Sequence, residues 1–236
     1  MRAYALQLKN KTPYEKNLQE LLEIINELPK NALMVAPEVC LTDYDYDNLD
    51  KACEFSQYAL NELLKVINNQ ILCLTLLLKE DESVVNKAVV IHKGKIVHSQ
   101  NKAKLFKLGN EHHFLKPGDE KDIKIFEINN LKFGILICFE LRYKELWQRL
   151  EGADIILVPS QWGLPRKRHL EILPHALAVM NQCFVIVANS SKEDMASSSA
   201  IYTPTGGKTI NDYAKIIESN LDFKELKFMR KYLSLS

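Results

Sequence analysis

GILICFELRYKEL, residues 134–146, begins as an apolar run and ends in charged residues. The run from Gly134 to Cys138 is typical of a buried β-strand, and Glu140 and Arg142 follow it closely. A cysteine in a strand is most often a small buried hydrophobe, whereas a reactive thiol needs a neighbouring base or cation. The interpretation of Cys138 therefore depends on whether the rest of the chain supplies those two groups.

Two other apolar strands are expected to end in polar side chains. ALMVAPEV (32–39) carries Glu38 near its end, and DIILVPS (154–160) ends at Ser160, with Trp162 two residues later. In sheets covered by helices, sites collect at the carboxyl ends of strands. Glu38 is therefore a candidate base, although a solvated glutamate at a strand end is the common alternative.

The polar loop 100–121 holds candidate cations and a second carboxylate. It contains Lys102, Lys104 and Glu111. Most lysines are surface residues, and residue type alone gives no reason to treat Lys102 differently.

Apolar strands alternate with amphipathic helices along the chain, without a segment of linker composition. Helical spacing predicts helices over 13–28, 49–67 and 165–181, the last kinked at Pro174. Apolar runs predict strands over 3–9, 32–39, 71–78, 123–128, 132–139, 154–160 and 183–190, with a hairpin over 88–99. This order is typical of an α/β fold, and we expect one domain over residues 1–236.

Composition and charge exclude several classes of function. The 236 residues include 31 Lys and Arg against 30 Asp and Glu, a formal charge of +1 that lacks the positive field of nucleic-acid-binding proteins. The longest apolar run, ILCLTLLL (71–78), is far shorter than the ~18 residues of a membrane span, and no signal-peptide core opens the chain. We expect a cytoplasmic protein with neither a nucleic-acid nor a membrane partner.

The cysteines and histidines show no metal-binding pattern. Five cysteines form an odd set without a CxxC pair, and the six histidines include no HExxH motif. We therefore expect reduced thiols, no metal site and a reaction without a cofactor.

Taken together, four segments resemble the nitrilase, or carbon–nitrogen hydrolase, superfamily in their order and spacing. They are APEVCLTDY (36–44), NKAKLFKLGNEHHFLKPGD (101–119), GILICFELRYKELW (134–147) and ADIILVPSQWGLPRKRH (153–169). The resemblance continues through HALAVMNQCFVIVANSS (175–191) and covers most of the chain. It implies a four-layer α-β-β-α sandwich, and because such chains usually pair through helices, it implies a homodimer or larger homo-oligomer.

The resemblance also implies a catalytic triad. Glu38 would be the general base, Lys102 the lysine and Cys138 the nucleophile, and Glu111 matches a second glutamate that many members place beside the triad. The chain departs from the family pattern at Lys104, where members commonly have a histidine.

The implied reaction is hydrolysis of a non-peptide C–N bond in a small linear amide through a thioester on the cysteine, releasing ammonia and a carboxylate. The backbone N–H of Phe139 would help to stabilise the negative oxygen. Phenylalanine at this position favours an amidase over a nitrilase, and the pattern is most similar to the omega-amidase branch. Arg142, Ser160 and Trp162 are the candidates for binding the substrate. Arg142 or a residue near Trp162 would hold the free carboxylate of the substrate.

Three alternatives remain open at this point. Arg142 could instead form a salt bridge with Glu140 or Glu145. The same triad could act on N-carbamoyl amines or ureido acids, with release of carbon dioxide as well as ammonia. The chain could also be a non-catalytic subunit built on this fold.

Overall fold

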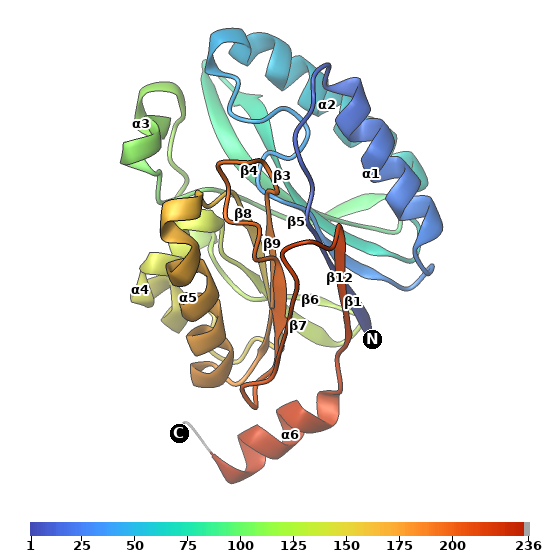
Figure 1. Cartoon of the computed structure of the whole chain (residues 1–236), viewed down its shortest axis with the longest axis vertical. Coiled ribbons are helices and arrows are strands. Elements are labelled where there is room, and N and C mark those ends of the chain that lie inside the picture. The colour runs from blue at the N-terminus through green and yellow to red at the C-terminus, as the bar shows by residue number, and fades with distance from the viewer. Residues whose placement is uncertain (234–236) are drawn as a thin grey trace.

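The computed structural model describes residues 1–233 and contains two six-stranded sheets (Figure 1). The first sheet has the order β12-β1-β2-β3-β4-β5, with β1 (Arg2–Leu6), β2 (Leu33–Val35), β3 (Ile71–Glu80), β4 (Ser83–His92), β5 (Lys95–Asn101) and β12 (Ile216–Asn220). The second has the order β11-β10-β9-β8-β7-β6, with β6 (Phe126–Ile128), β7 (Leu131–Ile135), β8 (Ile155–Ser160), β9 (Phe184–Asn189), β10 (Ala200–Tyr202) and β11 (Lys208–Ile210).

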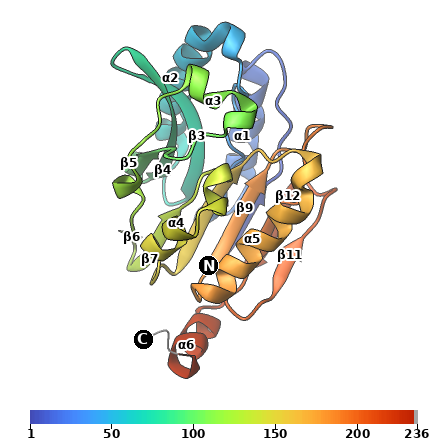
Figure 2. The same cartoon turned by 90° about the vertical axis from the view of Figure 1, so that its left-hand side faces the viewer.

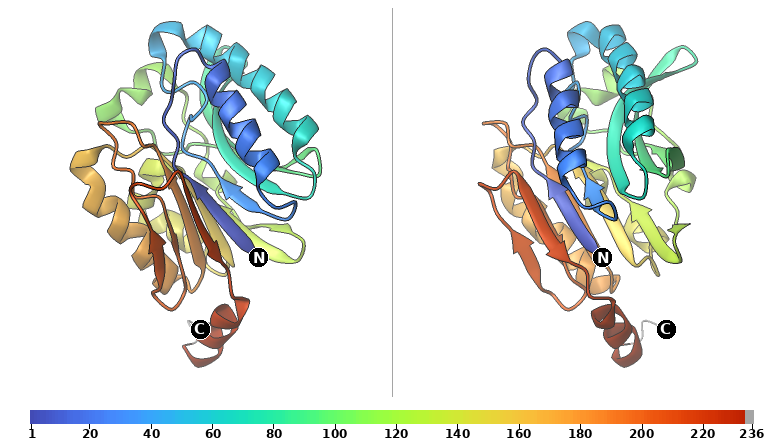
Figure 3. Two further views of the ribbon diagram at one scale, coloured as in Figure 1. Left: turned by 45° about the vertical axis from the view of Figure 1, so that its right-hand side comes forward. Right: turned by 90° about the vertical axis from the view of Figure 1, so that its right-hand side faces the viewer.

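Helices cover the outer face of each sheet. Helices α1 (Glu15–Glu27) and α2 (Leu49–Val66) lie on the first sheet (Figure 3), and α4 (Lys144–Arg149) and α5 (Lys167–Met180) lie on the second (Figure 2). Strands β1, β2 and β3 contact β8 and β9, so the two sheets pack against each other in the middle. The layers are helix, sheet, sheet and helix, as the family resemblance implies.

Strand β1 contributes side chains to two hydrophobic cores, one between the sheets and one between the first sheet and its helices. Ala3 and Ala5 belong to the core between the sheets, whereas Tyr4 and Leu6 belong to the core under α1 and α2. Successive side chains of a strand point to opposite faces, so one apolar strand can serve both cores. The small alanines let the two sheets approach closely, and the larger side chains fill the space below the helices.

The parallel strands bring their carboxyl ends to one edge of each sheet. β1, β2 and β3 are mutually parallel neighbours in the first sheet, and β7, β8 and β9 are in the second. At this edge the two sheets are joined directly, because the Glu38 N–H donates to the Ser160 carbonyl at 3.1 Å. Residues that follow β2, β7 and β8 therefore meet at one place.

Several elements differ from their predicted lengths. Strand β7 ends at Ile135 because the chain turns at Cys138, whose φ is +49°, into the short 3-10 helix η4 (Cys138–Arg142). Strand β2 covers three residues and stops before Pro37, which cannot donate a backbone hydrogen bond. The predicted loop 100–121 contains the short helix α3 (Glu111–Phe114). Helix α5 (Lys167–Met180) runs through Pro174, so the predicted helix over 165–181 is present.

The last helix, α6 (Phe223–Tyr232), lies below the sheets in Figure 1. Leu226 and Met229 are buried, and the Arg230 guanidinium bonds Asp154 Oδ1 and the Ala153 carbonyl, both at 2.7 Å. Helix α6 therefore packs on its own chain. Residues 234–236 lie outside the described residues. Within residues 1–233, no helix has both the length and the apolar content needed to cross a bilayer.

Candidate active site

A buried ammonium between two carboxylates forms the centre of the site. Lys102 follows β5, and its Nζ lies 2.8 Å from Glu38 Oε1 and 2.7 Å from Glu111 Oε1. Glu38 follows β2, and Glu111 is the first residue of α3. All three side chains are at most 4% exposed, so the surface interpretations of Glu38 and Lys102 are wrong.

The charges in this cluster depend on one another. Burial opposes the charge on Lys102, but the carboxylates of Glu38 and Glu111 outweigh it and raise the lysine pKa. Burial and the nearby Glu38 raise the pKa of Glu111, against the opposing effect of Lys102. A buried ion pair is stable when its geometry is good and its remaining polar atoms are hydrogen-bonded.

Tyr44 and Asn86 complete the cluster, and neither was predicted as a site residue. The Tyr44 hydroxyl donates to Glu38 Oε1 at 2.7 Å, and Asn86 Nδ2 donates to the same oxygen at 2.9 Å. Together with Lys102, three donors reach one oxygen of Glu38. Tyr44 lies in the APEVCLTDY segment, and Asn86 is a buried amide in the apolar strand β4, a weak signal in a single sequence.

Cys138 lies where the second sheet meets this cluster. Its side chain is buried, and the backbone N–H of Gln161 points to its sulfur at 3.5 Å. Burial raises the thiol pKa well above its usual value, Glu38 raises it further, and the Lys102 ammonium and the Gln161 N–H oppose them. The thiol is therefore neutral at rest and needs a base to become a nucleophile.

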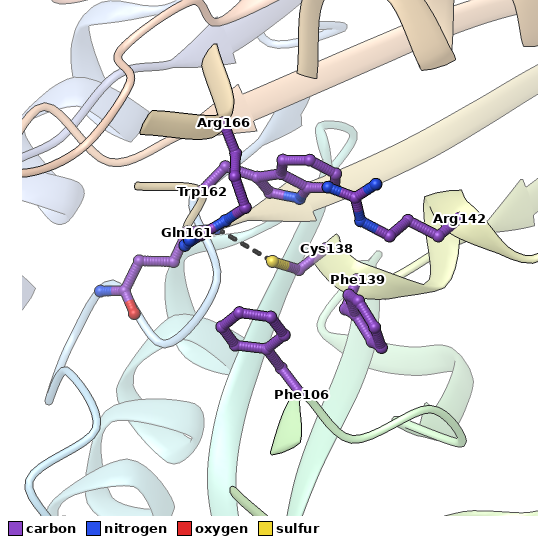
Figure 4. Close-up of a pocket in the computed structure, with 7 residues that line it drawn as sticks. All are labelled: Phe106, Cys138, Phe139, Arg142, Gln161, Trp162 and Arg166. Atoms are coloured by element: carbon purple, nitrogen blue, oxygen red, sulfur yellow. Dashed lines mark hydrogen bonds between the residues drawn. The ribbon is translucent and has the colours of Figure 1, made fainter. Parts of the chain in front are cut away.

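A narrow pocket opens beside Cys138 (Figure 4). Its lining consists of Phe106, Cys138, Phe139, Arg142, Gln161, Trp162 and Arg166. The pocket encloses about 20 Å³, which is room for about one water molecule. Cys138 therefore lies in the wall of a small opening that is lined mainly by aromatic rings and arginines.

Two arginines lie over aromatic rings at this mouth. The Arg142 guanidinium is 4.7 Å from the Trp162 ring centre, and that of Arg166 is 5.0 Å from the Phe106 ring centre. Arg142 also contacts His169 Nδ1 at 2.9 Å, and within residues 1–233 neither arginine forms an ion pair with a carboxylate. The alternative in which Arg142 forms a salt bridge with Glu140 or Glu145 is therefore wrong.

The remaining candidates occupy different positions. Ser160 is fully buried, its hydroxyl donates to the Val158 carbonyl at 3.5 Å, and it does not line the pocket. Its main chain matters instead, because its carbonyl accepts the Glu38 N–H. Trp162 lines the pocket, and its buried indole N–H has no partner among the described residues.

Lys104 does not line the pocket beside the thiol. Its ammonium pairs with Glu120 at the surface and lies 4.7 Å from the centre of the Tyr143 ring. Burial opposes the charge, but the bond to Glu120 outweighs it and raises the pKa of Lys104. The lysine at this position is thus used in a surface pair.

Comparison with known proteins identifies the family. A family model of carbon-nitrogen hydrolases matches residues 2–216. The chain is 31% identical over 204 residues to a 2-oxoglutaramate amidase from Bacillus subtilis, covering 81% of this chain and 78% of the relative. It is 28% identical over 126 residues to an omega-amidase from Escherichia coli, covering 53% of this chain and 48% of that protein.

The fold comparison agrees with the sequence comparison. A nitrilase-superfamily protein of branch 10 from Saccharomyces cerevisiae superposes with a TM-score of 0.85 at 23% identity, covering 100% of this chain and 95% of that one. The expected four-layer fold and the expected class of enzyme, an amidase, are thereby confirmed. The chain belongs to the carbon–nitrogen hydrolase family, within its omega-amidase-like branch.

Proposed function

We propose that this protein hydrolyses the terminal amide of a small monoamide that also carries a carboxylate, through a thioester on Cys138. The observation that carries the proposal is the buried cluster of Glu38, Lys102 and Glu111 beside a buried thiol. The cluster offers a base and a cation at the point where a nucleophilic cysteine needs both. The names of the amidase relatives point to the same reaction.

The first step forms the thioester. Glu38 accepts the thiol proton, the sulfur bonds to the amide carbon, and the carbonyl electrons move to oxygen. The Lys102 ammonium and the Phe139 N–H stabilise that oxygen, and one such donor contributes on the order of 3 kcal/mol. The C–N bond then breaks as Glu38 returns the proton to nitrogen, and ammonia leaves.

The second step releases the acid. Glu38 takes a proton from a water molecule, the hydroxide attacks the thioester carbon, and the C–S bond breaks with return of a proton to sulfur. Glu111 holds the lysine from the side opposite Glu38, so that the ammonium stays fixed while the base changes its charge. The raised thiol pKa supports this scheme, because a thiol that is neutral at rest depends on Glu38.

The charges at the mouth indicate the substrate class. Arg142 and Arg166 have no carboxylate partner within residues 1–233, and no Asp or Glu lines the pocket. The unpartnered indole N–H of Trp162 is a third donor. This lining favours a carboxylate at the far end of the substrate and disfavours an ammonium, since like charges cost several kcal/mol when desolvated.

Ammonia release across four compounds tests the substrate class. Glutaric acid monoamide is expected to exceed both pentanamide, which lacks the carboxylate, and glutamine, which adds an ammonium, by at least about 10-fold in kcat/KM. The fourth compound is an N-carbamoyl amine. Faster turnover of that compound, with carbon dioxide release, would replace the proposal by carbamoyl hydrolysis.

Two sets of variants test the residues. Cys138→Ala should abolish ammonia release and leave the circular dichroism spectrum unchanged, and wild-type protein should carry an acyl adduct on Cys138 in a mass spectrum. Arg166→Gln should raise KM for the monoamide acid but not for pentanamide. Its matched control is Arg168→Gln, an exposed arginine two residues away that does not line the pocket.

We also propose that the protein forms a homodimer or larger homo-oligomer. Ile172, Val179 and Met180 on α5 are 57%, 42% and 61% exposed and recur at helical spacing on one face. Ile172→Lys with Met180→Lys should shift the sedimentation of the protein to that of a monomer, and Tyr213→Lys, an exposed aromatic outside this face, should not.

A further inference from the structure

Glu140 is a buried carboxylate that the reaction scheme does not use. It is 0% exposed and lies in η4, two residues after Cys138. Unlike Glu38 and Glu111, it forms no ion pair within residues 1–233. A buried carboxylate without a cation is costly, and a neutral side chain would fill the same space at less cost.

Both oxygens of Glu140 bind backbone N–H groups from two different segments. Oε2 accepts the N–H of Ile137 at 2.7 Å, immediately before the nucleophile. Oε1 accepts the N–H of Ala103 at 2.7 Å, immediately after the lysine. One side chain therefore connects the turn that carries Cys138 with the segment that carries Lys102.

The turn at Cys138 needs such support. Its φ of +49° places a non-glycine residue in the left-handed region, which costs about 1–2 kcal/mol and persists where surrounding contacts fix it. The bond from the Ile137 N–H to Glu140 closes this turn at its first residue. Without it, the sulfur has fewer constraints on its position relative to the ammonium.

We propose that Glu140 is a positioning residue that, in its ionised form, holds the Cys138 turn and the Lys102 segment in register. The inference rests on the proposed roles of Cys138 and Lys102. An ionised carboxylate accepts a charge-assisted hydrogen bond at each oxygen, whereas a protonated one offers only a neutral hydroxyl oxygen, a weaker acceptor, to one of the two backbone donors. Protonation therefore loosens one of the two connections.

The surroundings of Glu140 place this change near neutral pH. Burial raises its pKa to about 7, against the N–H groups of Ile137 and Ala103, the Lys102 ammonium and the Lys104 N–H. Cys138 and Arg142 are the other ionisable side chains in η4. We expect kcat to rise as the pH passes about 7, with KM nearly constant.

Glu140→Gln tests the inference, because the amide matches the size of the side chain but presents an NH2 group where an acceptor is needed. We expect kcat to fall by about 10–100-fold at pH 8, KM to change less than threefold, and the rise of kcat near pH 7 to disappear. Glu145→Gln, a partly exposed glutamate in α4, is the matched control and should behave as wild type.

Glu140→Asp separates position from charge. It keeps the carboxylate but shortens it by one methylene, so it should retain the rise near pH 7 with a lower kcat. Full activity of folded Glu140→Asp or Glu140→Gln at pH 8 would overturn the inference. A failure of the proposed function would be seen in other measurements. Cys138→Ala would still release ammonia, or the wild-type protein would carry no acyl adduct.

Discussion

At the scale of single residues, Lys102 connects two buried carboxylates. Its replacement is expected to lower both the stability of the fold and kcat. Lys102→Met leaves Glu38 and Glu111 buried without their cation, so stability should fall by about 3–5 kcal/mol. The lost oxyanion donor should lower kcat by at least about 100-fold. Chemical denaturation and ammonia release measure the two effects separately.

Lys104→Met is the matched control for that variant. Its partner Glu120 is 44% exposed, and surface pairs contribute at most about 1 kcal/mol. Activity close to that of wild type is expected. A large loss of activity in Lys104→Met would show that this ammonium acts at the site after all.

Glu140 also predicts how stability depends on pH. Its pKa is raised from 4.5 to about 7 in the folded chain, so between these values the native state holds a proton that the unfolded state has lost. The stability from this group is complete below pH 4.5 and is lost as the pH rises to about 7, a change of about 3 kcal/mol. The difference in unfolding free energy between wild type and Glu140→Gln should therefore change over this range. As the pH rises, the variant should become more stable relative to wild type. Parallel curves would contradict the prediction.

The sequence allowed some of these residues to be predicted and not others. Glu38, Lys102, Glu111 and Cys138 stand in motifs whose order is specific, and the fold brings them to one place. Asn86 and Arg166 act through tertiary contacts, with partners 48 residues and 60 residues away in the chain. Such contacts leave no local pattern in a single sequence, because the residues next to each partner carry no signal of the distant contact.

At the scale of elements, the predicted strands and helices exist, and their errors lie at the ends next to the site. The apolar run 132–139 predicts one continuous strand, but backbone pairing stops at Ile135 and the left-handed turn at Cys138 follows. An apolar run predicts that its residues are buried, but it does not determine their backbone conformation. The residues after Ile135 are buried in a turn instead of a strand. At Pro174 the periodicity is the better guide, because the apolar residues keep helical spacing across the proline and the predicted helix is present there.

Gly118 fixes the end of β5. A Cβ here would lie 2.5 Å from the Asn101 carbonyl oxygen, and the Gly118 N–H donates to the Lys102 carbonyl at 2.9 Å. Gly118→Ala should therefore shift the Lys102 segment and lower kcat by 10-fold or more, about the loss expected for a displacement below 1 Å. Steady-state kinetics on the folded variant measure this.

Gly152→Ala separates that effect from general strain. Gly152 has a φ of +90°, but nothing lies within 4 Å of an added Cβ, and it does not line the pocket. A loss of about 1 kcal/mol in stability with unchanged kcat is expected. Equal kinetic effects at both glycines would contradict a specific role for the Gly118 contact.

At the scale of the whole molecule, the site is assembled from both sheets. The first sheet supplies Glu38 and Lys102, and the second supplies Cys138 and Trp162. The family resemblance allowed this sandwich to be predicted, whereas strand patterns alone gave only helix-covered sheets. The pairing of β12 with β1 was not predicted, because IIESN is a short, half-polar segment whose partner lies at the other end of the sequence.

That pairing determines when the first sheet can be finished during synthesis. β1 leaves the ribosome before the strand that pairs with its outer edge, residues 216–220, and all other strands of the two sheets lie between them in the sequence. Until then, one edge of β1 presents unpaired N–H and C=O groups to any other strand nearby. The nascent chain therefore carries an open sheet edge while the intervening strands are made, and this is the stage at which a chaperone that shields strand edges would have most effect on yield.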